Sequence, residues 1–439
     1  MFPGTLILTK EWRREMSVYD VAVIGAGPAG LAAVQKLKGK GLRVVLIDNG
    51  KAIHERDKDN LVEITEGHGG AGLFSDGKFS FFPSASALWE LPNELELRQA
   101  YEWTCTTLNT YGLDTPPFPT NPKDFTVGSG EWVLKDYPSN YMSLEDRINL
   151  VEDMVQTADA DIITQTKFLS YTYVKRKDAL IMNLRDKNAN TYQIECRRII
   201  LASGRFGPLE IASLVKKQSF NRLEVGFRIE QQEDLAFFKN MKQLDPKLKF
   251  RSDDGVIEWR TFCACRDGET VLTKTQDLWT VSGHSDGPST GRSNVGFNTR
   301  ILDENIADRT LNNVVSAMKQ KDSYFRIKVQ DILAGNAHII TQLASIYGEE
   351  LFDKMLQGLR NIIKKFPEID HENTHIVGPT LEGVGWYPSL DGDLSLETSP
   401  YPVWVAGDAC GIFRGIVAAM ISGHYAASAV LKTLAVEAA

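Results

Sequence analysis

A glycine-rich segment near the start of the chain constrains the fold more than any other feature. It follows Tyr19–Ile24, which has the composition of a β-strand, and a helix-type segment then leads to a second apolar run, Val44–Ile47. Its glycines permit a tight strand-to-helix turn, close approach of backbone N–H groups to a diphosphate, and close helix packing. The pattern predicts a βαβ unit that binds a dinucleotide through Gly25, Ala26, Gly27, Pro28, Ala29 and Gly30.

Asp48 ends the second apolar run, about 20 residues after the glycine turn. At this spacing a carboxylate accepts hydrogen bonds from the ribose of the adenosine half of a dinucleotide. An aspartate before Asn49-Gly50 is also typical of a plain turn, so both roles stay open. The same glycine spacing recurs once, at Gly67–Gly72, and the sequence predicts one dinucleotide site, at the first βαβ unit.

The overall composition is that of a folded chain with an acidic balance. The 439 residues are enough for about three folding units, 43% of them are apolar, and the formal net charge is −8. Because acidic surfaces repel phosphate backbones, we expect no nucleic-acid partner. The five cysteines fit no secreted disulfide framework, which favours a cytoplasmic location. Arg414 and His424 interrupt the apolar stretch 411–431, so we expect a buried helix there and no membrane span.

Two later segments indicate which dinucleotide is bound. Arg198–Gly204 resembles the element that closes the FAD domain of the glutathione-reductase-like flavoprotein superfamily, and Val403–Asp408 resembles its Gly-Asp element. The resemblance implies FAD, with the Asp408 carboxylate on the ribityl chain. A helix beginning near Arg414 would direct its positive end at the flavin pyrimidine. The cofactor contacts expected at this end are Gly204, Gly407, Asp408, Gly415 and Ile416.

A closer resemblance extends from Tyr19 almost to the C-terminus. Gly69–Lys78, Arg260–Cys265 and the stretch after Arg414 are together similar to a group of largely uncharacterised bacterial and archaeal FAD-dependent dehydrogenases. This resemblance implies flavin redox chemistry and supplies no substrate. Independently, the glycines of residues 69–77 allow a loop to lie against a flat ring, and a solvent-exposed turn is the alternative. We expect the ring to be contacted by Gly69, Gly70 and Ser75, with Lys78 as a cation for flavin or substrate.

A pair of cysteines lies on an expected strand at residues 257–266. Strand alternation places Cys263 and Cys265 on one face together with Trp259 and Thr261. Three interpretations stay open: small buried residues, a metal pair, and a redox pair. The first is favoured, because free cysteine packs as a small apolar residue and no further cysteine or histidine stands at zinc spacing, so we predict no metal site. Packing is also favoured for Cys410 over covalent attachment of the flavin, which leaves FAD non-covalent.

The second half of the chain offers candidate substrate contacts. Arg228, Arg260 and Arg266 fall on expected strands, where they can bind a carboxylate or phosphate through paired hydrogen bonds. Structural ion pairs are the more frequent role of strand arginines. The polar loop 283–294 carries His284, which is either a proton-transfer group or merely exposed. We take Lys78, Arg260 and His284 as the candidate catalytic residues.

These features together predict an α/β fold of two domains. The first is a glutathione-reductase-like FAD-binding Rossmann domain, with a parallel sheet and an antiparallel meander, and the second is an α+β substrate domain. We expect the first domain at residues 17–210, with an irregular insertion at about 84–140, and again at 374–439. The second spans 211–373 and includes amphipathic helices around 311–318 and across 343–359.

The expected function is that of an FAD-dependent oxidoreductase. Electrons would pass between the flavin and a small-molecule substrate that binds between the two domains. The first alternative is a flavin monooxygenase that uses transiently bound NAD(P)H. A non-catalytic flavin-binding protein and a tRNA-modifying flavoprotein are further alternatives. The sequence lacks the Walker loop. The spacing His-Glu-x-x-His occurs at 371–375 and Gly-x-Ser-x-Gly occurs in the polar loop 283–291, but we expect neither the helix nor the strand-to-helix turn that these hydrolase motifs need. Hydrolase and phosphotransferase functions therefore have no support.

Overall fold

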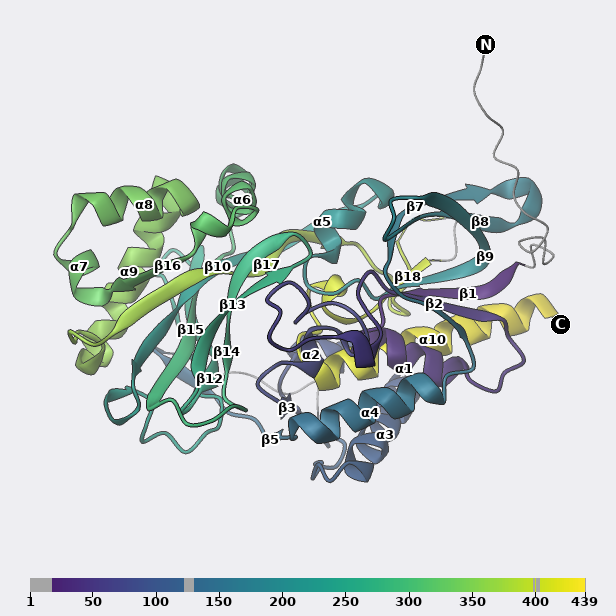
Figure 1. The fold of residues 1–439 in the computed structure, drawn as a ribbon, viewed down its shortest axis with the longest axis horizontal. Helices are drawn as coiled ribbons and strands as arrows, with labels where there is room; N and C mark the ends of the chain where they lie inside the picture. The colour runs from purple at the N-terminus through teal and green to yellow at the C-terminus, as the bar shows by residue number, and fades with distance from the viewer. Residues whose placement is uncertain (1–17, 122–129, 398, 400–402, 439) are drawn as a thin grey trace, which may run out of the picture.

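The computed structural model describes residues 18–121, 130–397, 399 and 403–438. Two domains lie side by side in Figure 1, and each has its own hydrophobic core. The first domain contains both ends of the described chain, drawn in purple and yellow, and the second contains the green middle part. This is the α/β architecture that the sequence predicts, with a Rossmann-like sheet and a second domain.

A mostly parallel sheet forms the centre of the first domain. Its strands are β1 (Tyr19–Ile24), β2 (Val44–Ile47), β6 (Asp161–Ile163), β7 (Thr166–Val174), β8 (Ala179–Asp186), β9 (Thr191–Leu201) and β18 (Val403–Val405). The order β6-β2-β1-β9 is parallel throughout, and β18 pairs in parallel with the end of β9. β8 and β7 extend the sheet as the predicted antiparallel meander. β1, β2 and β18 are apolar runs because a parallel sheet is covered on both faces.

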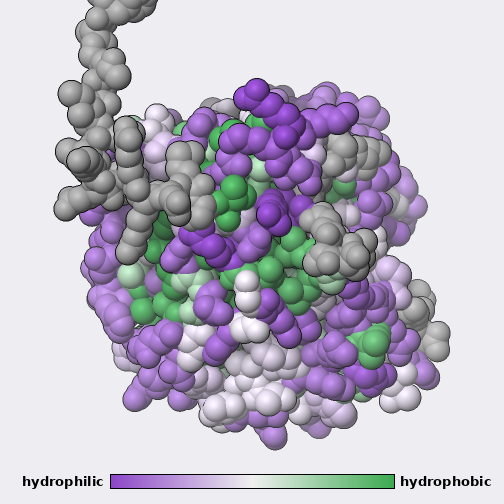
Figure 2. All heavy atoms as spheres, turned by 90° about the vertical axis from the view of Figure 1, so that its right-hand side faces the viewer, coloured by the Kyte–Doolittle hydropathy of each residue, from purple (hydrophilic) through white to green (hydrophobic). Residues whose placement is uncertain are grey.

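Helices α1 (Pro28–Leu37) and α10 (Ile416–Ala438) pack against each other on this sheet (Figure 1). They approach closely at Gly423, where a Cβ atom would lie 1.9 Å from the carbonyl oxygen of Ala29. The apolar stretch 411–431 is therefore largely a buried helix, as expected. Within the described chain, we find no helix long and apolar enough to cross a membrane. Figure 2 shows the end of the molecule formed by the first domain, where hydrophilic residues surround a central group of hydrophobic ones.

Two helices of the intervening segments, α3 (Glu94–Thr110) and α4 (Leu144–Gln156), complete the first domain. Their first turns are capped by Asn93 and Ser143, whose side-chain oxygens accept hydrogen bonds from backbone N–H groups. The short elements near the domain boundary are α2 (Gly70–Leu73), α5 (Gly207–Ile211), and the strand pair β3 (Lys78–Ser80) and β5 (Ser139–Tyr141).

An antiparallel sheet forms the second domain, in the order β16-β17-β10-β15-β12-β11-β4. Its strands are β4 (Val133–Lys135), β10 (Gln218–Gln232), β11 (Lys247–Arg251), β12 (Ile257–Cys265), β15 (Arg292–Ile301), β16 (Phe325–Lys328) and β17 (His375–Pro388). A separate hairpin consists of β13 (Glu269–Thr275) and β14 (Leu278–His284). The helices of this domain are α6 (Glu304–Met318), α7 (Val329–Leu333), α8 (Ala337–Tyr347) and α9 (Glu349–Lys365).

One expected helix is two helices in the structure. The apolar face across 343–359 is divided between α8 and α9, which meet at Gly348. Gly348 has φ +80°, in the left-handed region that favours glycine, so the helix stops there and the chain changes direction.

The two sheets also divide the chain differently from the expected domains. β4 lies within the segment 84–140, which we expected to be an insertion in the first domain, yet it is an edge strand of the second sheet. β17 lies beyond residue 373, where we expected the chain to return to the first domain, and it pairs along most of β10. The change back to the first sheet comes only with β18. Which sheet each of these strands joins is decided by pairing between segments far apart in the sequence, and the local residue pattern does not indicate that pairing.

Candidate functional site

A cavity of about 440 Å³ lies between the two domains. Its first-domain wall includes the β1–α1 turn and the loop before α10, and its second-domain wall includes residues of β10, β12 and β14. Most of the predicted cofactor contacts line it: Gly25, Gly27, Pro28, Ala29, Asp48, Gly70, Ser75, Gly204, Gly407, Asp408, Gly415 and Ile416. Ala26, Gly30 and Gly69 do not line the cavity. The fold thus brings both ends of the chain to one site.

The glycines of the β1–α1 turn differ in what each one makes room for. Gly25 has φ +104°, and a Cβ atom there would lie 2.4 Å from the carbonyl oxygen of Ala202. A Cβ atom at Gly30 would lie 1.8 Å from the carbonyl oxygen of Gly25. At Gly27 the nearest atom would be 3.8 Å away, which is ordinary contact. The protein itself requires Gly25 and Gly30, whereas the bare backbone at Gly27 faces the cavity at the N-terminus of α1, as a diphosphate requires.

Asp48 holds the surrounding loops together. Its carboxylate accepts hydrogen bonds from the backbone N–H groups of Ala26 at 2.6 Å, Gly50 at 2.7 Å and Gly67 at 2.9 Å. The turn-forming role that we considered for this residue is therefore present in the structure. The contact with a ribose stays a prediction, supported by the place of Asp48 in the cavity wall.

Glu66 lies beside Asp48 and is a cavity residue that the sequence patterns missed. Its carboxylate accepts hydrogen bonds from the side chain of Asn49 at 2.7 Å and from the backbone N–H of Gln276 at 3.0 Å. Burial raises the pKa of this carboxyl. Glu66 follows no strand and belongs to no motif, so only the folding of its loop against β2 and the β13–β14 hairpin places it here.

The opposite end of the cavity is shaped by the loop between β18 and α10. Gly407 and Gly415 both have positive φ, at +71° and +103°, so this backbone passes along the wall without side chains. The Asp408 carboxylate lies 3.3 Å from Nε of Arg414 and 3.8 Å from Nε of Arg205. α10 begins at Ile416, close to the start that we expected at Arg414. The thiol of Cys410 is buried and contacts the carbonyl oxygen of Val405, as expected for a packed side chain.

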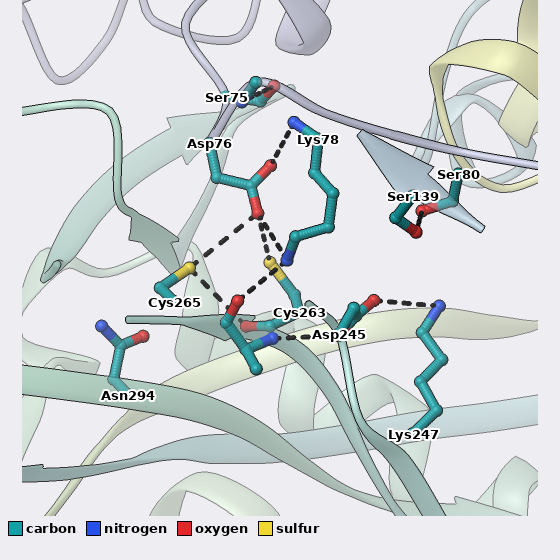
Figure 3. A network of polar contacts seen from close by, with 12 residues as sticks. Ser75, Asp76, Lys78, Ser80, Ser139, Asp245, Lys247, Cys263, Cys265 and Asn294 are labelled. Carbon is teal, nitrogen blue, oxygen red and sulfur yellow. Dashed lines mark hydrogen bonds and ion pairs between the residues drawn. The ribbon is translucent and has the colours of Figure 1, made fainter. Parts of the chain in front are cut away.

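Lys78 lines the cavity, but its ammonium group is already engaged. Nζ lies 3.1 Å from Oδ2 of Asp76 and donates to the carbonyl oxygen of Ala264 at 2.8 Å (Figure 3). The side chain is 5% exposed. Burial by itself would lower the pKa of this ammonium group, and the charges of Asp245 and Asp76 raise it well above its ordinary value. Lys78 is therefore a permanent cation that holds two parts of the site together.

The three strand arginines do not lie on one surface. Arg228 and Arg260 line the cavity. Arg266 instead donates to four backbone carbonyl groups of residues 238–243, away from the cavity, so the expectation that it shares a substrate surface is wrong. The physical reason is a register shift in β12 after Phe262, which breaks the strand alternation on which the expectation depended.

His284 ends β14 and lies partly buried in the cavity wall. Burial lowers the pKa of its imidazole below the ordinary value, although the nearby carboxylates of Asp286 and Asp76 act in the opposite direction. The neutral ring can accept or donate a proton. The structure thus brings all three candidate catalytic residues to one cavity, while their chemical roles stay predictions.

A group of basic residues at the second-domain end was not predicted. Lys247 lines the cavity beside Arg260, and its Nζ lies 3.6 Å from Oδ2 of Asp245. Lys135, on the edge strand β4, donates to Oγ of Ser86. Burial, followed by the charges of Lys247 and Arg260, lowers the pKa of Lys135 to about 7. No local signal marks these residues, because the pairing of β4 with β11 is what brings them together.

The fold and this cavity define an α/β protein with a Rossmann-like unit at the cavity wall. Residues 19–62, which form β1, α1 and β2, match the family model described as pyridine nucleotide-disulphide oxidoreductase. The match covers the glycine turn and Asp48 and supports the expected class, an FAD-dependent oxidoreductase. No curated protein matches the chain significantly.

Several solved structures are similar over most of the chain. A flavoprotein/dehydrogenase from Cytophaga hutchinsonii is 14% identical over 95% of this chain and 79% of its own, with a TM-score of 0.39. NikD, an amino acid oxidase of nikkomycin biosynthesis, is 11% identical over 95% of both chains, with a TM-score of 0.45. A geranylgeranyl bacteriochlorophyll reductase-like protein from Thermoplasma acidophilum is 12% identical over 96% of this chain and 80% of its own, with a TM-score of 0.42. These TM-scores lie below 0.5, so we transfer no ligand or substrate from these structures.

Proposed function

We propose that this protein is an FAD-dependent oxidoreductase that binds FAD non-covalently and takes a small-molecule substrate between its two domains. The observation that carries this proposal is the cavity, because its wall extends from the bare backbone of Gly27 to Arg228 and Arg260 of the second sheet. Bound FAD supplies two-electron chemistry at its ring, and the protein supplies binding, orientation and exclusion of water.

The first-domain residues bind and orient the cofactor. Backbone N–H groups at the start of α1 donate to the diphosphate. The diphosphate can approach them closely because Gly27 has no side chain. Asp48 keeps the glycine turn in place through Ala26 and offers its remaining acceptor capacity to a ribose. Asp408, oriented by Arg414, accepts hydrogen bonds from hydroxyl groups of the ribityl chain.

The second-domain residues favour a substrate with an acidic group. Arg260 and Lys247 line the cavity, and Lys135 lies beside them. Arg260 is only loosely paired, with Nη1 3.4 Å from Oε1 of Glu224, and a carboxylate or phosphate can compete for it. His284 is the residue that we propose for proton transfer, because it lines the same cavity and burial keeps its imidazole neutral near pH 7.

A pair of glycine variants tests the proposed cofactor site. Gly27→Ala places a methyl group where only ordinary contacts exist, so we expect an intact fold and FAD binding weakened about tenfold or more. Gly30→Ala places one against the carbonyl oxygen of Gly25, so we expect a loss of stability of about 1–3 kcal/mol. The measurements are the visible absorbance of the purified proteins, FAD titration of the apoproteins, and their thermal unfolding.

Purified wild type that carries no flavin and takes none up would overturn the proposal. So would a Gly27→Ala protein that retains FAD as the wild type does. A Gly27→Ala protein with reduced thermal stability in the absence of FAD would show that the glycine serves the fold itself.

A further inference from the structure

Two cysteines and a carboxylate form a buried cluster that the proposed function does not use. Sγ of Cys263 lies 3.4 Å from Oδ2 of Asp76, and Sγ of Cys265 lies 3.9 Å from the same oxygen (Figure 3). The three atoms lie within 4.8 Å of one another. Cys263 lines the cavity between the domains, whereas Cys265 is fully buried behind it.

The local backbone turns both sulfur atoms toward the same carboxylate. Regular pairing of β12 with β15 reaches Phe262 and resumes only at Cys265, so Cys263 lies within a bulge and Cys265 directly follows it. Cys263 has φ +47°, in the left-handed region that a residue with a side chain rarely adopts. The expected alternation therefore fails, but the two sulfur atoms still lie side by side.

Two cations surround the cluster and favour a negative charge on sulfur. Lys78 contacts Asp76 and also the carbonyl oxygen of Ala264, the residue between the cysteines. Arg228 donates to the carbonyl oxygen of Cys263, and its Nη2 lies 3.6 Å from Sγ of Cys265. Asp245 also acts on Lys78, but Lys247 lies 3.6 Å from Asp245 and balances it. Asp76 then faces an ammonium and a guanidinium group, which leaves room for one thiolate in the charge balance.

The two thiols differ in acidity. A hydrogen bond from Cys265 lowers the pKa of Cys263, against the effects of burial and of Asp76, and the positive charges of Lys78 and Arg228 lower it as well. The same hydrogen bond, together with burial, raises the pKa of Cys265. A more acidic thiol that faces the cavity beside a less acidic, buried thiol is the arrangement of an attacking and a resolving cysteine.

A metal ion fits this cluster less well than a redox reaction does. Among the described residues, the site offers three ligand atoms, whereas zinc usually takes four. Oδ2 of Asp76, which would be a ligand, already contacts the ammonium of Lys78. Arg228 lies against Sγ of Cys265, so two cations would repel a third.

We propose that Cys263 and Cys265 are a redox-active dithiol that forms an intrachain disulfide and exchanges two electrons with the cofactor in the cavity. The electron partner rests on the proposed function, whereas formation of the disulfide does not. In the oxidising direction the bond between the two Sγ atoms forms as the S–H bond of Cys265 breaks. Cys263 reacts as the thiolate, so the two electrons and the single proton released by Cys265 pass to oxidised flavin. In the other direction, reduced flavin breaks the disulfide and restores the dithiol.

Peptide mapping tests the disulfide without reference to flavin. Trypsin cleaves after Arg260 and Arg266, so both cysteines lie in the peptide Thr261–Arg266. After equilibration of the whole protein in oxidised glutathione and alkylation, we expect this peptide without alkyl groups and two hydrogen atoms lighter than the reduced form. After equilibration in reduced glutathione, we expect it with two alkyl groups. The buried Cys105, Cys196 and Cys410 are internal controls that remain reduced.

An anaerobic reductive titration tests the electron transfer. The wild type should take up two more electrons per flavin than Cys263→Ser or Cys265→Ser, which keep the size of the side chain. Cys105→Ser is the matched control and should titrate as the wild type does. Asp76→Asn should lower the pH at which Cys263 is alkylated, because Asp76 acts on the thiol through its negative charge.

The outcomes separate the possible failures. A Thr261–Arg266 peptide that stays fully alkylated in every glutathione mixture overturns the proposal. So does stoichiometric zinc that is lost in Cys263→Ser, because it shows a metal site. A disulfide in a protein that binds no flavin overturns the proposed function and the exchange with flavin, and leaves the dithiol pair standing. Equal electron uptake by wild type and Cys263→Ser overturns the exchange alone.

Discussion

At the scale of single residues, charges buried in pairs dominate the cavity wall. Asp76 and Lys78 are both buried, and Lys78 also contacts the backbone of β12. Burial pushes the pKa of Asp76 upward, and the charge and hydrogen bonds of Lys78 bring it below the ordinary value. Removing one member of such a pair is costly, because the other charge is left in a poorly solvated place.

We therefore expect Lys78→Met to destabilise the protein by about 3 kcal/mol. The double variant Lys78→Met with Asp76→Asn should lose less than the single variant, since no uncompensated carboxylate remains. Urea unfolding of the wild type, the two single variants and the double variant gives the double-mutant cycle that measures this coupling. A Lys78→Met protein of wild-type stability would show that the ammonium group is free for substrate.

His424 gives a pH dependence at a second buried site. Its ring stacks on Trp103 at 5.0 Å, and burial lowers its pKa to about 3. The unfolded chain binds a proton at this residue below about pH 6.5, whereas the folded chain does so only near pH 3. His424 therefore stabilises the folded state fully above about pH 6.5 and progressively less as the pH falls toward 3.

At pH 5 the protonation of His424 in the unfolded chain lowers the free energy of unfolding by about 2 kcal/mol at most. His424→Phe keeps the aromatic stack and should remove that part of the acid sensitivity. We expect the loss of unfolding free energy between pH 7.5 and pH 5 to be smaller in the variant by about 1–2 kcal/mol. An unchanged loss in urea unfolding would contradict the assignment.

At the scale of elements, the contact between α1 and α10 connects the two ends of the described chain. α1 carries the glycine turn at its start, and α10 begins beside the Gly407–Asp408 loop. Gly423 lets the helices approach until its backbone lies against the carbonyl group of Ala29. The helix packing thus places the two halves of the cofactor site opposite each other.

Gly423→Ala should push α10 away from α1, because a Cβ atom there meets backbone and has no flexible neighbour to displace. The gain in helix propensity, about 1 kcal/mol, is smaller than the expected strain, so we expect a net loss of about 1–3 kcal/mol together with weaker FAD binding. Gly287→Ala is the control, since its Cβ atom would meet nothing within 4 Å. Thermal unfolding and FAD titration are the measurements.

At the scale of the whole molecule, Glu382 connects the two domains. It lies on β17 of the second sheet, 6% exposed, and its Oε1 accepts a hydrogen bond from Nη1 of Arg205 at 2.7 Å. Arg414, in the loop before α10, contacts the same carboxylate and the Glu382 carbonyl group. Both arginines come from the first-domain wall of the cavity, so this carboxylate fixes how the two walls face each other.

Glu382→Gln should loosen the contact between the domains. We expect a loss of about 1–3 kcal/mol of stability and faster proteolytic cleavage between the domains, since two guanidinium groups lose their shared charge partner. Glu397→Gln is the matched control: it breaks an ion pair with Lys217 in which both side chains are at least one-third exposed. The control should change stability by less than about 1 kcal/mol. Equal effects of the two variants would show that Glu382 does not hold the domains.

The sequence predicted more of the fold than of the candidate site. The β1–α1–β2 unit, the meander and the buried α10 follow from local patterns: glycines that need bare backbone, alternation, and an apolar run interrupted by charges. The assignment of β4 and β17 could not be predicted, because strand pairing over long separations leaves no local mark. Glu66, Lys135 and Lys247 were missed for the same reason.

The sequence by itself determined the strand-turn-helix unit near the start of the described chain, because the positive φ of Gly25 and the contact of Gly30 with the Gly25 carbonyl group are local to the turn. The tertiary structure alone decided which side chains share the cavity. It turned Arg266 away, paired Lys78 with Asp76, and placed Cys263 beside them. Backbone sterics act between neighbours along the chain, whereas charge pairing and burial act between groups that only the folded sheets bring into contact.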